Sequence, residues 1–318
     1  MNDLTFFNNR LRDRLIERYH RTGRCGPQSV PGLNFSVLYD NVEVPSCFYH
    51  LAVALILQGE KTVTAGSRVY RYGEETAIVT ASDLPTSYRL EASRSKPFVS
   101  TSLQLDARII EELVRTEPRI LERHTPTQSS HVFSVFKAPE ELLSAFDRLF
   151  QIVDDPERLR LLGPGIVREI HYHLLVSETG APLCRFYENA SIENRIAKSI
   201  HWIRQHFREP IDFDALLGVA NMSQSTFYRH FRDVTGLTPL QYRKVLCLHE
   251  AQSLMLSKGY TAARAAYEVG YKSPQQFTRE YKRTFGHTPR RSVQDIREGD
   301  AGPAPSPETV LAAAATLR

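Results

Sequence analysis

Two stretches in the last third of the chain repeat one pattern of aromatic and hydrogen-bonding residues at an interval of fifty positions. The first runs from Ser223 to Phe231, the second runs from Ser273 to Tyr281, and each is followed by Gly-x-Thr-Pro. Arginine, glutamine and threonine side chains can hydrogen-bond to the edges of DNA bases. Two copies are too few for a stacked repeat protein, which needs about three or more. The pair therefore predicts two similar modules and a ligand that has a repeat of its own.

The first copy has the local signals of a helix, a turn and a second helix. Apolar residues have helical spacing over Asp212 to Val219, Asn221 tolerates a left-handed turn, and Ser223 is a suitable N-cap. Gly236 marks the end of the second helix, and Thr238-Pro239 opens another. This order is the helix-turn-helix pattern.

The second copy has the same order of signals. A helix is expected from Ala262 to Val269, a turn over Gly270 to Lys272, and an N-cap at Ser273. Val219-Ala220 aligns with Val269-Gly270 at the same interval of fifty. We therefore expect two helix-turn-helix motifs with equivalent geometry.

Helical spacing separates an inner and an outer face on each second helix. Phe227 and Phe231 are four residues apart, as are Phe277 and Tyr281, so each pair faces the core. The residues on the opposite faces are the predicted DNA-base contacts: Ser225, Tyr228, Arg229, Gln275, Gln276, Thr278 and Arg279. The alternative is that the two arginines only solvate a helix surface. Their equivalent placement on two capped helices favours DNA contact.

The segment between the two copies predicts a long spacer helix. Leu240 to about Ser257 contains no glycine or proline and would span roughly 27 Å as a helix. The residues available for packing are Leu246, Leu248, Ala251, Leu254 and Met255. A spacer of this size would let one monomer place two helices in successive major grooves, which lie about 34 Å apart.

The charge distribution agrees with DNA binding. Residues 191–298 contain 17 Lys and Arg against 10 Asp and Glu, which is a net charge of +7, and the rest of the chain carries −3 of the total +4. A basic surface of this kind attracts phosphates. The predicted phosphate contacts are Lys244, Lys272, Lys282, Arg283, Arg290 and Arg291.

These motifs resemble the AraC/XylS family of bacterial transcription regulators, over about residues 192–297. The resemblance implies a seven-helix domain whose third and sixth helices enter adjacent major grooves. It implies Ser225, Tyr228 and Arg229 as readers on the third helix, and Gln275, Thr278 and Arg279 on the sixth, with Gln276 as a further candidate. Two residues depart from the family pattern. Leu217 stands where alanine is usual and Asn221 where glycine is common, whereas the second copy has Ala266 and Gly270 at those places.

The N-terminal part is of a different kind. After an amphipathic helix over Leu4 to His20, β-prone runs alternate with turns, and helices follow over Asp106–Thr116, Pro139–Val153 and Asp155–Leu175. The β-prone runs are Leu33–Tyr39, Phe48–Leu57, Lys61–Thr64, Arg68–Tyr72, Thr76–Thr80 and Phe98–Leu105. This spacing predicts a small β-barrel or jelly roll. About residues 31–175 resemble the cupin-like N-terminal domain of one branch of the family.

The expected organisation is a two-domain chain. Residues 1–30 form an N-terminal helix and arm, 31–175 the cupin-like effector or dimerisation domain, 176–190 a linker, 191–298 the all-α DNA-binding domain with two helix-turn-helix motifs joined by a long helix, and 299–318 a disordered tail rich in Ala, Pro and Gly. Pro139 to Leu175 carries more apolar residues than one barrel face needs, so it is the candidate dimer surface.

An effector pocket is predicted from the aromatic residues of the barrel. The candidates are Phe35, Phe48, Tyr49, Tyr70 and Tyr72. The alternative is that these side chains are simply core. A small-molecule effector would bind there if the domain senses a ligand.

The residues for catalysis or metal binding do not converge. His50 is the one histidine in the strand region, and His171 and His173 point to different sides of a helix, so we expect no metal, no cofactor and no catalytic residue. Cys47 and His50 lie on opposite faces of a strand, which argues against a nucleophile–base pair. The alternative function is a DNA-binding protein whose barrel, or an exposed thiol such as Cys25, carries enzymatic or redox-sensing chemistry.

The expected partners follow from this assignment. They are double-stranded promoter or operator DNA, a small-molecule effector, a second copy of the chain in a homodimer, and RNA polymerase if the protein is an activator. The 318 residues show no secretory signal and no apolar run long enough for a membrane helix, and the four cysteines lack C-x-x-C spacing. We therefore expect a cytoplasmic protein without a membrane partner.

Overall fold

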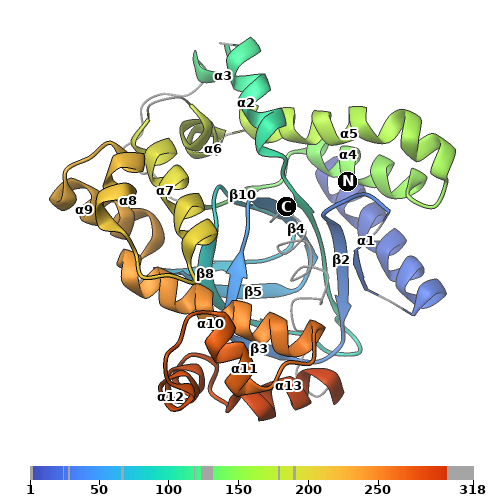
Figure 1. The fold of residues 1–318 in the computed structure, drawn as a ribbon. Helices are drawn as coiled ribbons and strands as arrows, with labels where there is room; N and C mark the ends of the chain where they lie inside the picture. The colour runs from blue at the N-terminus through green and yellow to red at the C-terminus, as the bar shows by residue number, and fades with distance from the viewer. Residues whose placement is uncertain are drawn as a thin grey trace.

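The computed structural model describes residues 3–23, 25–27, 29–65, 68–117, 119–122, 132–177, 180–188 and 191–298. The expected disordered tail, residues 299–318, lies outside the described residues. The N-terminal half contains two antiparallel sheets, and the C-terminal part is helical (Figure 1). The prediction of a β domain followed by an all-α domain is confirmed.

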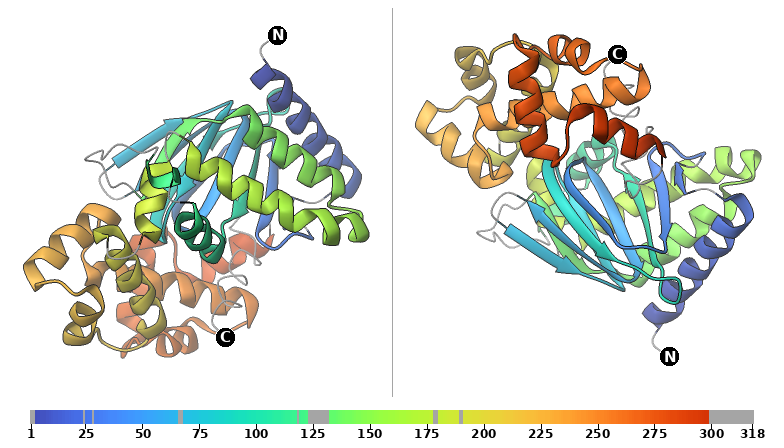
Figure 2. Two further views of the ribbon diagram at one scale, coloured as in Figure 1. Left: turned by 90° about the horizontal axis from the view of Figure 1, so that it is seen from above. Right: turned by 90° about the horizontal axis from the view of Figure 1, so that it is seen from below.

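The first sheet has six strands in the order β1-β2-β9-β4-β7-β10. They are β1 (Gly26–Pro27), β2 (Leu33–Leu38), β4 (Ala52–Gln58), β7 (Thr76–Thr80), β9 (Phe98–Gln104) and β10 (Phe133–Lys137). Helices α1 (Asp3–Thr22), α4 (Glu140–Ile152) and α5 (Pro156–Val176) lie on its outer side (Figures 1 and 2). Asp147 of α4 is almost fully buried and accepts ion pairs from Arg10 and Arg14, which fastens α1 to α4.

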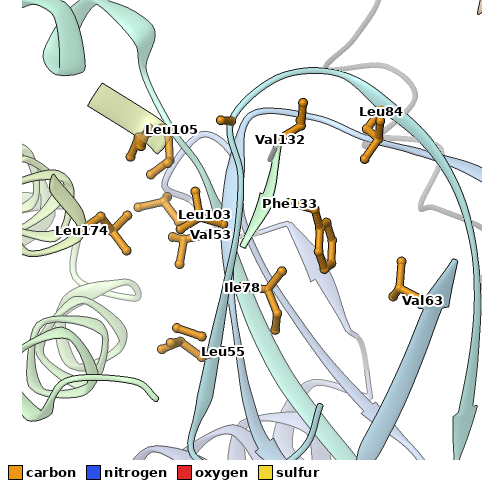
Figure 3. Close-up of a cluster of buried hydrophobic side chains, with 14 of the residues drawn as sticks. Val53, Leu55, Val63, Ile78, Leu84, Leu103, Leu105, Val132, Phe133 and Leu174 are labelled. Atoms are coloured by element: carbon orange, nitrogen blue, oxygen red, sulfur yellow. The ribbon is translucent and has the colours of Figure 1, made fainter. Parts of the chain in front are cut away.

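The second sheet has four strands in the order β3-β8-β5-β6. They are β3 (Val42–Tyr49), β8 (Leu84–Glu91), β5 (Glu60–Ala65) and β6 (Arg68–Tyr72). Ile78 and Phe133 of the first sheet point toward Val63 and Leu84 of the second, so one apolar layer lies between the sheets (Figure 3). Leu55 and Leu103 are buried and lie on the side of Leu174 (Figure 3), so a second layer lies under the helices.

Helices α2 (Ala107–Thr116) and α3 (Arg119–Glu122) follow β9, and α6 (Gly180–Tyr187) stands in the chain between the two parts, where it contacts α2, α5 and α7. The helical domain then follows as α7 (Ile192–His206), α8 (Phe213–Ala220), α9 (Gln224–Thr235), α10 (Pro239–Ser257), α11 (Ala262–Glu268), α12 (Pro274–Phe285) and α13 (Pro289–Glu298). Residues 191–298, all described, therefore contain the seven helices that the family resemblance implied. The β-sandwich lies between α1 on one side and this domain on the other (Figures 1 and 2).

Two sequence expectations about the secondary structure need correction. The run Phe48–Leu57 is two strands, because β3 ends at Tyr49 and β4 begins at Ala52. The expected linker 176–190 contains helix α6, which buries Leu183, Cys184 and Phe186. Pro182 is compatible with that helix because it lies in the first turn.

The candidate dimer surface is mostly internal. Most of its apolar residues are buried in the chain's own core, among them Leu142, Leu143, Phe146, Leu149 and Phe150. Leu162 is half exposed, and Leu161 beside it is exposed as well. The apolar excess of this segment is explained by packing under the six-stranded sheet, where Phe35 meets Phe150 edge-to-face at 6.1 Å.

Candidate nucleic-acid interface

The first helix-turn-helix module, α8 with α9, uses the turn residues that the sequence indicated. The side chain of Asp212 caps α8 by accepting from the Ala215 amide at 3.1 Å. Asn221 adopts a left-handed conformation with φ 48° at the end of α8. Ser223 stands at the N-cap of α9, but its hydroxyl donates to Thr226 Oγ1 at 2.9 Å instead of accepting from the helix backbone.

The second module, α11 with α12, has stricter requirements at its turn. Thr261 caps α11, and Ser273 caps α12 by accepting from the Gln276 amide at 3.3 Å. Gly270 has φ 87°, and a Cβ on it would lie 2.0 Å from the carbonyl oxygen of Arg208. Only glycine fits this position. Any other residue would have to adopt the left-handed backbone conformation, and its Cβ would collide with the backbone that follows α7.

The two turns differ in length by one residue. Asn221 and Gly270 are the left-handed residues of the two turns and are 49 positions apart, whereas Ser223 and Ser273 are 50 apart. The burial pattern of α8 matches that of α11 at the same interval of 49. The alignment of Val219-Ala220 with Val269-Gly270 at an interval of fifty is therefore wrong for the first helices. The pairing of Leu217 with Ala266 and of Asn221 with Gly270 is the structural one.

The inward aromatic pairs lie as predicted. Phe227 and Phe231 are fully buried with ring centroids 5.4 Å apart, and Phe277 and Tyr281 are fully buried with centroids 5.5 Å apart. Both recognition helices are thus fixed by the same pair of contacts.

The predicted base-contacting residues occupy the outer faces of α9 and α12. Those that are exposed are Ser225, Arg229, Gln275, Gln276 and Arg279. Tyr228 is half-buried and stacks on Phe213 at 5.9 Å, and Thr278 is half-buried with its hydroxyl donating to the Pro274 carbonyl at 2.8 Å. On α12 a shallow surface hollow is lined by Pro274, Gln275, Thr278 and Arg279. Three of the predicted readers of the second module therefore converge on one site.

The predicted phosphate contacts divide into two groups. Exposed side chains are found at Lys272, Lys282, Arg283, Arg290 and Arg291. Lys244 instead forms an ion pair with Glu280 of α12 at 2.9 Å. Although burial acts in the opposite direction, the hydrogen bonds from Lys244, Tyr271 and Gln276 hold the pKa of Glu280 below its usual value. Lys244 thus orients α12 from α10, a role that its sequence position did not reveal.

Helix α10 connects the two modules. Its 19 residues correspond to a length of about 28 Å. A capping box of Thr238 and Gln241 starts the helix, and all of the residues proposed for packing are buried: Leu246, Leu248, Ala251, Leu254 and Met255. The prediction of a continuous spacer helix is confirmed.

The helical domain is joined to the sandwich by a polar contact at Asp83. Nδ1 of His50 lies 2.5 Å from Oδ1 of Asp83, and Arg204 of α7 forms an ion pair with the other carboxylate oxygen. The Tyr242 hydroxyl of α10 donates to the Asp83 carbonyl at 3.3 Å. Although burial acts in the opposite direction, His50 and Arg204 hold the pKa of the Asp83 carboxyl well below its usual range. Neither Asp83 nor Arg204 carried a sequence signal, because the two residues are far apart in the chain.

A second contact links β3 to α10 and α12. Ser46 Oγ and His249 Nε2 share a hydrogen bond of 2.8 Å. The His249 ring meets Phe48 edge-to-face at 5.0 Å and Phe285, the last residue of α12, at 4.8 Å. Burial lowers the pKa of His249 to about 3, so the ring is neutral near pH 7. The second module is therefore fastened directly to the sandwich.

The five aromatic candidates for an effector pocket do not lie together. Phe35 packs against Phe150 under the helices, and Phe48 packs against α10. Tyr49, Tyr70 and Tyr72 do share one site between the sheets. Their ring centroids lie 6.0, 4.6 and 6.2 Å from the centroid of Phe133.

Cys47, Cys25 and His171 are at least half-buried and contact the surrounding protein. Cys47 contacts Thr86 Oγ1 at 3.0 Å, and burial raises its pKa to about 11. Cys25 is half-buried, and burial raises its pKa as well. His171 is buried, and its Nε2 accepts from the Asp106 amide at 2.8 Å. No group of three or more potential metal ligands occurs among the described residues.

Comparison with known proteins bears on both halves of the chain. The family of AraC-type transcriptional regulator N-termini matches residues 29–182, and a helix-turn-helix domain family matches residues 216–294. The chain belongs to the AraC family of transcription regulators. The HTH-type transcriptional activator RhaS of Escherichia coli is 29% identical over 109 residues, which are 34% of this chain and 38% of RhaS. The match to these relatives thus spans little more than a third of their length.

The two-domain fold is shared with ToxT of Vibrio cholerae. An apo form of ToxT aligns with a TM-score of 0.56 and 10% identity over 84% of this chain and 99% of ToxT. ToxT bound to an unsaturated fatty acid aligns with a TM-score of 0.50 and 9% identity over 82% of this chain and 93% of ToxT. In the described part of this AraC-family chain, no helix is long and apolar enough to cross a membrane.

Proposed function

We propose that this protein is a sequence-specific DNA-binding regulator of transcription in which α9 and α12 enter successive major grooves of one duplex. One observation carries the proposal. Two recognition helices, each fixed by a buried aromatic pair, present exposed polar side chains and are joined through α10, a helix about 28 Å long. This length is close to the repeat of the major groove, about 34 Å.

The residues take separate roles in this proposal. The base readers are Ser225, Tyr228, Arg229, Gln275, Gln276, Thr278 and Arg279. The phosphate contacts are Lys272, Lys282, Arg283, Arg290 and Arg291, whereas Lys244 positions α12 through Glu280. Arg279 and Gln275 are the readers with the best support, since both are exposed and line the hollow on α12.

We further propose that the N-terminal domain senses a small-molecule effector, forms a homodimer, or does both, and that it carries no catalytic residue. The fold shared with ToxT and the aromatic cluster at Phe133 support an effector domain. The raised pKa values of Cys25 and Cys47 argue against the alternative of a reactive thiol, since a thiol reacts as its thiolate. Because promoter DNA is the proposed ligand, we place the protein in the cytoplasm, where it would contact RNA polymerase if it acts as an activator.

The test is selection of binding sites from random duplex DNA by the full chain and by Arg279→Ala. We expect a two-part site with one helical turn between its halves. Loss of Arg279 should weaken binding to that site by about 1–3 kcal/mol and relax one base position, because a bidentate contact to a guanine edge is removed.

The matched control is Lys282→Ala, which removes the same charge from the same helix. Lys282 is assigned to phosphate, so its loss should weaken all sequences alike, reduce the salt dependence of binding, and leave the selected motif unchanged. If Arg279→Ala returned the parental motif with equal information content, the assignment of Arg279 as a reader would be wrong.

A further inference from the structure

Lys61 stands on the inner face of the four-stranded sheet. In the sheet, Lys61 lies opposite Tyr72 of β6 and opposite Leu90 of β8. Val63, two residues further along β5, is fully buried. Because alternate residues of a strand share a face, Lys61 and Val63 both point between the sheets. A lysine is an unusual choice for that face.

The Lys61 ammonium lies among aromatic rings instead of carboxylates. Its Nζ is 3.8 Å from the ring centroid of Tyr88 and 5.3 Å from that of Tyr49. Within the described part of the chain, Lys61 forms no ion pair and no hydrogen bond. Ring faces attract a cation, but they do not supply the hydrogen-bond acceptors that its three N–H groups have in water.

A second polar group at the same site is also unsatisfied. The Tyr49 hydroxyl is buried and makes no hydrogen bond of good geometry, although the Tyr72 hydroxyl lies close to it. The rings of Tyr49, Tyr70 and Tyr72 surround Phe133 of the opposite sheet. The site therefore combines a cation without an acidic partner, a buried hydroxyl that makes no well-formed hydrogen bond, and apolar ring surfaces, which together match a molecule with an anionic head and an aromatic or apolar body.

We propose that the interior of the sandwich binds a small organic carboxylate, with Lys61 as its counter-ion and the Tyr49 hydroxyl as a hydrogen-bond donor. The Tyr70, Tyr72 and Tyr88 rings contact the body of the molecule. Naming this molecule an effector rests on the proposed function as a transcription regulator. Its binding to the sandwich does not.

Strand β3 connects this site to the helical domain. Cys47 and Tyr49 face the interior near Lys61, whereas Ser46, Phe48 and His50 alternate with them and contact α10 or Asp83. The pairing of β3 with β8 is irregular between Val44 and Cys47, and such a bulge lets a strand bend locally. Movement of Tyr49 around a bound carboxylate is therefore passed to the residues that touch the DNA-binding domain.

The experiment is isothermal titration calorimetry of the full chain with 2-naphthoate and with 2-naphthamide, its neutral twin of the same shape. We expect the carboxylate to bind at least about tenfold more tightly than the amide, since only the anion satisfies Lys61. Lys61→Met should abolish that preference, and Tyr49→Phe should weaken it. Lys96→Met is the matched control, because Lys96 is exposed and pairs with Glu74 at the surface. It should bind like the parent.

The free protein supplies a second readout. Lys61→Met should unfold at an equal or higher temperature than the parent, because it replaces an unpaired, part-buried ammonium by an apolar side chain of similar length. A lysine that served only the fold would give the opposite result.

The pH dependence has a defined sign. Burial lowers the pKa of Lys61 to about 8, so its charge is lost as the pH rises through that value. Naphthoate affinity should be constant below about pH 7 and fall by about tenfold per pH unit above 8. The titratable groups that face Lys61 are Cys47, Tyr49, Tyr72 and Tyr88, and burial raises all of their pKa values, so none of them ionises in this range.

Equal affinity for naphthoate and naphthamide, or no binding of naphthoate at millimolar concentration, would overturn the carboxylate site. Retention of the preference by Lys61→Met would overturn the assignment of Lys61. These titrations contain no DNA, so their failure is separable from a failure of the site-selection experiment on the helical domain.

Discussion

The two helix-turn-helix modules share a backbone plan but differ in how tightly their surroundings hold them. In the second module the turn is held by Gly270 against the Arg208 carbonyl, and the end of α12 packs on His249, which in turn contacts β3. In the first module a left-handed Asn221 replaces the glycine and Leu217 replaces a fully buried alanine. Helix α11 also contacts α12 more extensively than α8 contacts α9.

This difference shows that two modules with the same sequence pattern need not tolerate substitutions equally well. The second module lies in a chain of contacts that runs from β3 through α10 to the end of α12, so its orientation depends on the sandwich. The first module meets the sandwich through α7, where Arg204 pairs with Asp83. Substitutions at equivalent positions of the two modules therefore test the difference directly.

The largest loss of stability is expected for a substitution of Gly270, the glycine of the second turn. Gly270→Ala places a methyl group in the left-handed region and into the Arg208 carbonyl oxygen, 2.0 Å away. We expect a loss of about 3 kcal/mol in the free energy of unfolding, the sum of backbone strain and forced displacement. Urea denaturation measures the loss, and hydrogen exchange followed by mass spectrometry should locate the faster exchange in α11 and α12.

Gly259→Ala is the control for this substitution. Gly259 is also left-handed, with φ 66°, but nothing lies within 4 Å of a Cβ placed there. It should therefore show the strain alone, about 1 kcal/mol. Equal losses for the two variants would mean that the contact with Arg208 does not hold the second turn.

Sequence patterns were sufficient for the parts of this site whose causes are local. Helix caps, left-handed turns and the spacing of Phe227 and Phe231 depend on residues that are close together in the sequence. Both modules and the spacer helix were therefore predictable. The ion pairs Lys244–Glu280 and Asp83–Arg204 join residues that are distant in the chain, and a periodic sequence pattern does not predict such pairs.

The sandwich was less predictable for similar reasons. Strand β8 contains a proline and several polar residues, so its alternation is weak, although Tyr88 on its inner face is central to the proposed carboxylate site. Helix α6 begins with glycine and has Pro182 in its first turn, a composition that also suits a linker. The one-residue difference between the two turns was hidden because the serine caps keep an interval of fifty.

An intermediate loss of stability is expected at the position where α8 and α11, the first helices of the two modules, carry side chains of different volume. Ala266 is fully buried, so Ala266→Leu should overpack the second module and cost about 2 kcal/mol. The reverse change, Leu217→Ala, removes a half-buried side chain that packs on the core and should cost about 1 kcal/mol. Hydrogen exchange should show the two losses in different modules. A gain in stability for Leu217→Ala would mean that leucine strains the first module instead of filling it.

The smallest effect is expected at the left-handed residue of the first turn. Asn221→Gly removes a side chain from a conformation that favours glycine, but glycine also gives the unfolded chain more freedom, so the two effects nearly cancel. The free energy of unfolding should stay within about 0.5 kcal/mol of the parent. Trp202, the single tryptophan of the chain, lies on α7 beside this module, and its fluorescence during urea denaturation reports the change.

Asn221→Ala separates the turn geometry from the side chain at this position. Alanine keeps the left-handed strain without the local hydrogen bonding that lets asparagine adopt it, and should cost about 1 kcal/mol. The carbonyl of residue 221, which accepts from Arg195 at 3.3 Å, is present in both variants and cannot account for a difference between them. If Asn221→Gly lost as much stability as Asn221→Ala, the amide side chain itself would hold the first turn. The two modules would then differ in the nature of the contact that fixes each turn, not in how firmly it is fixed.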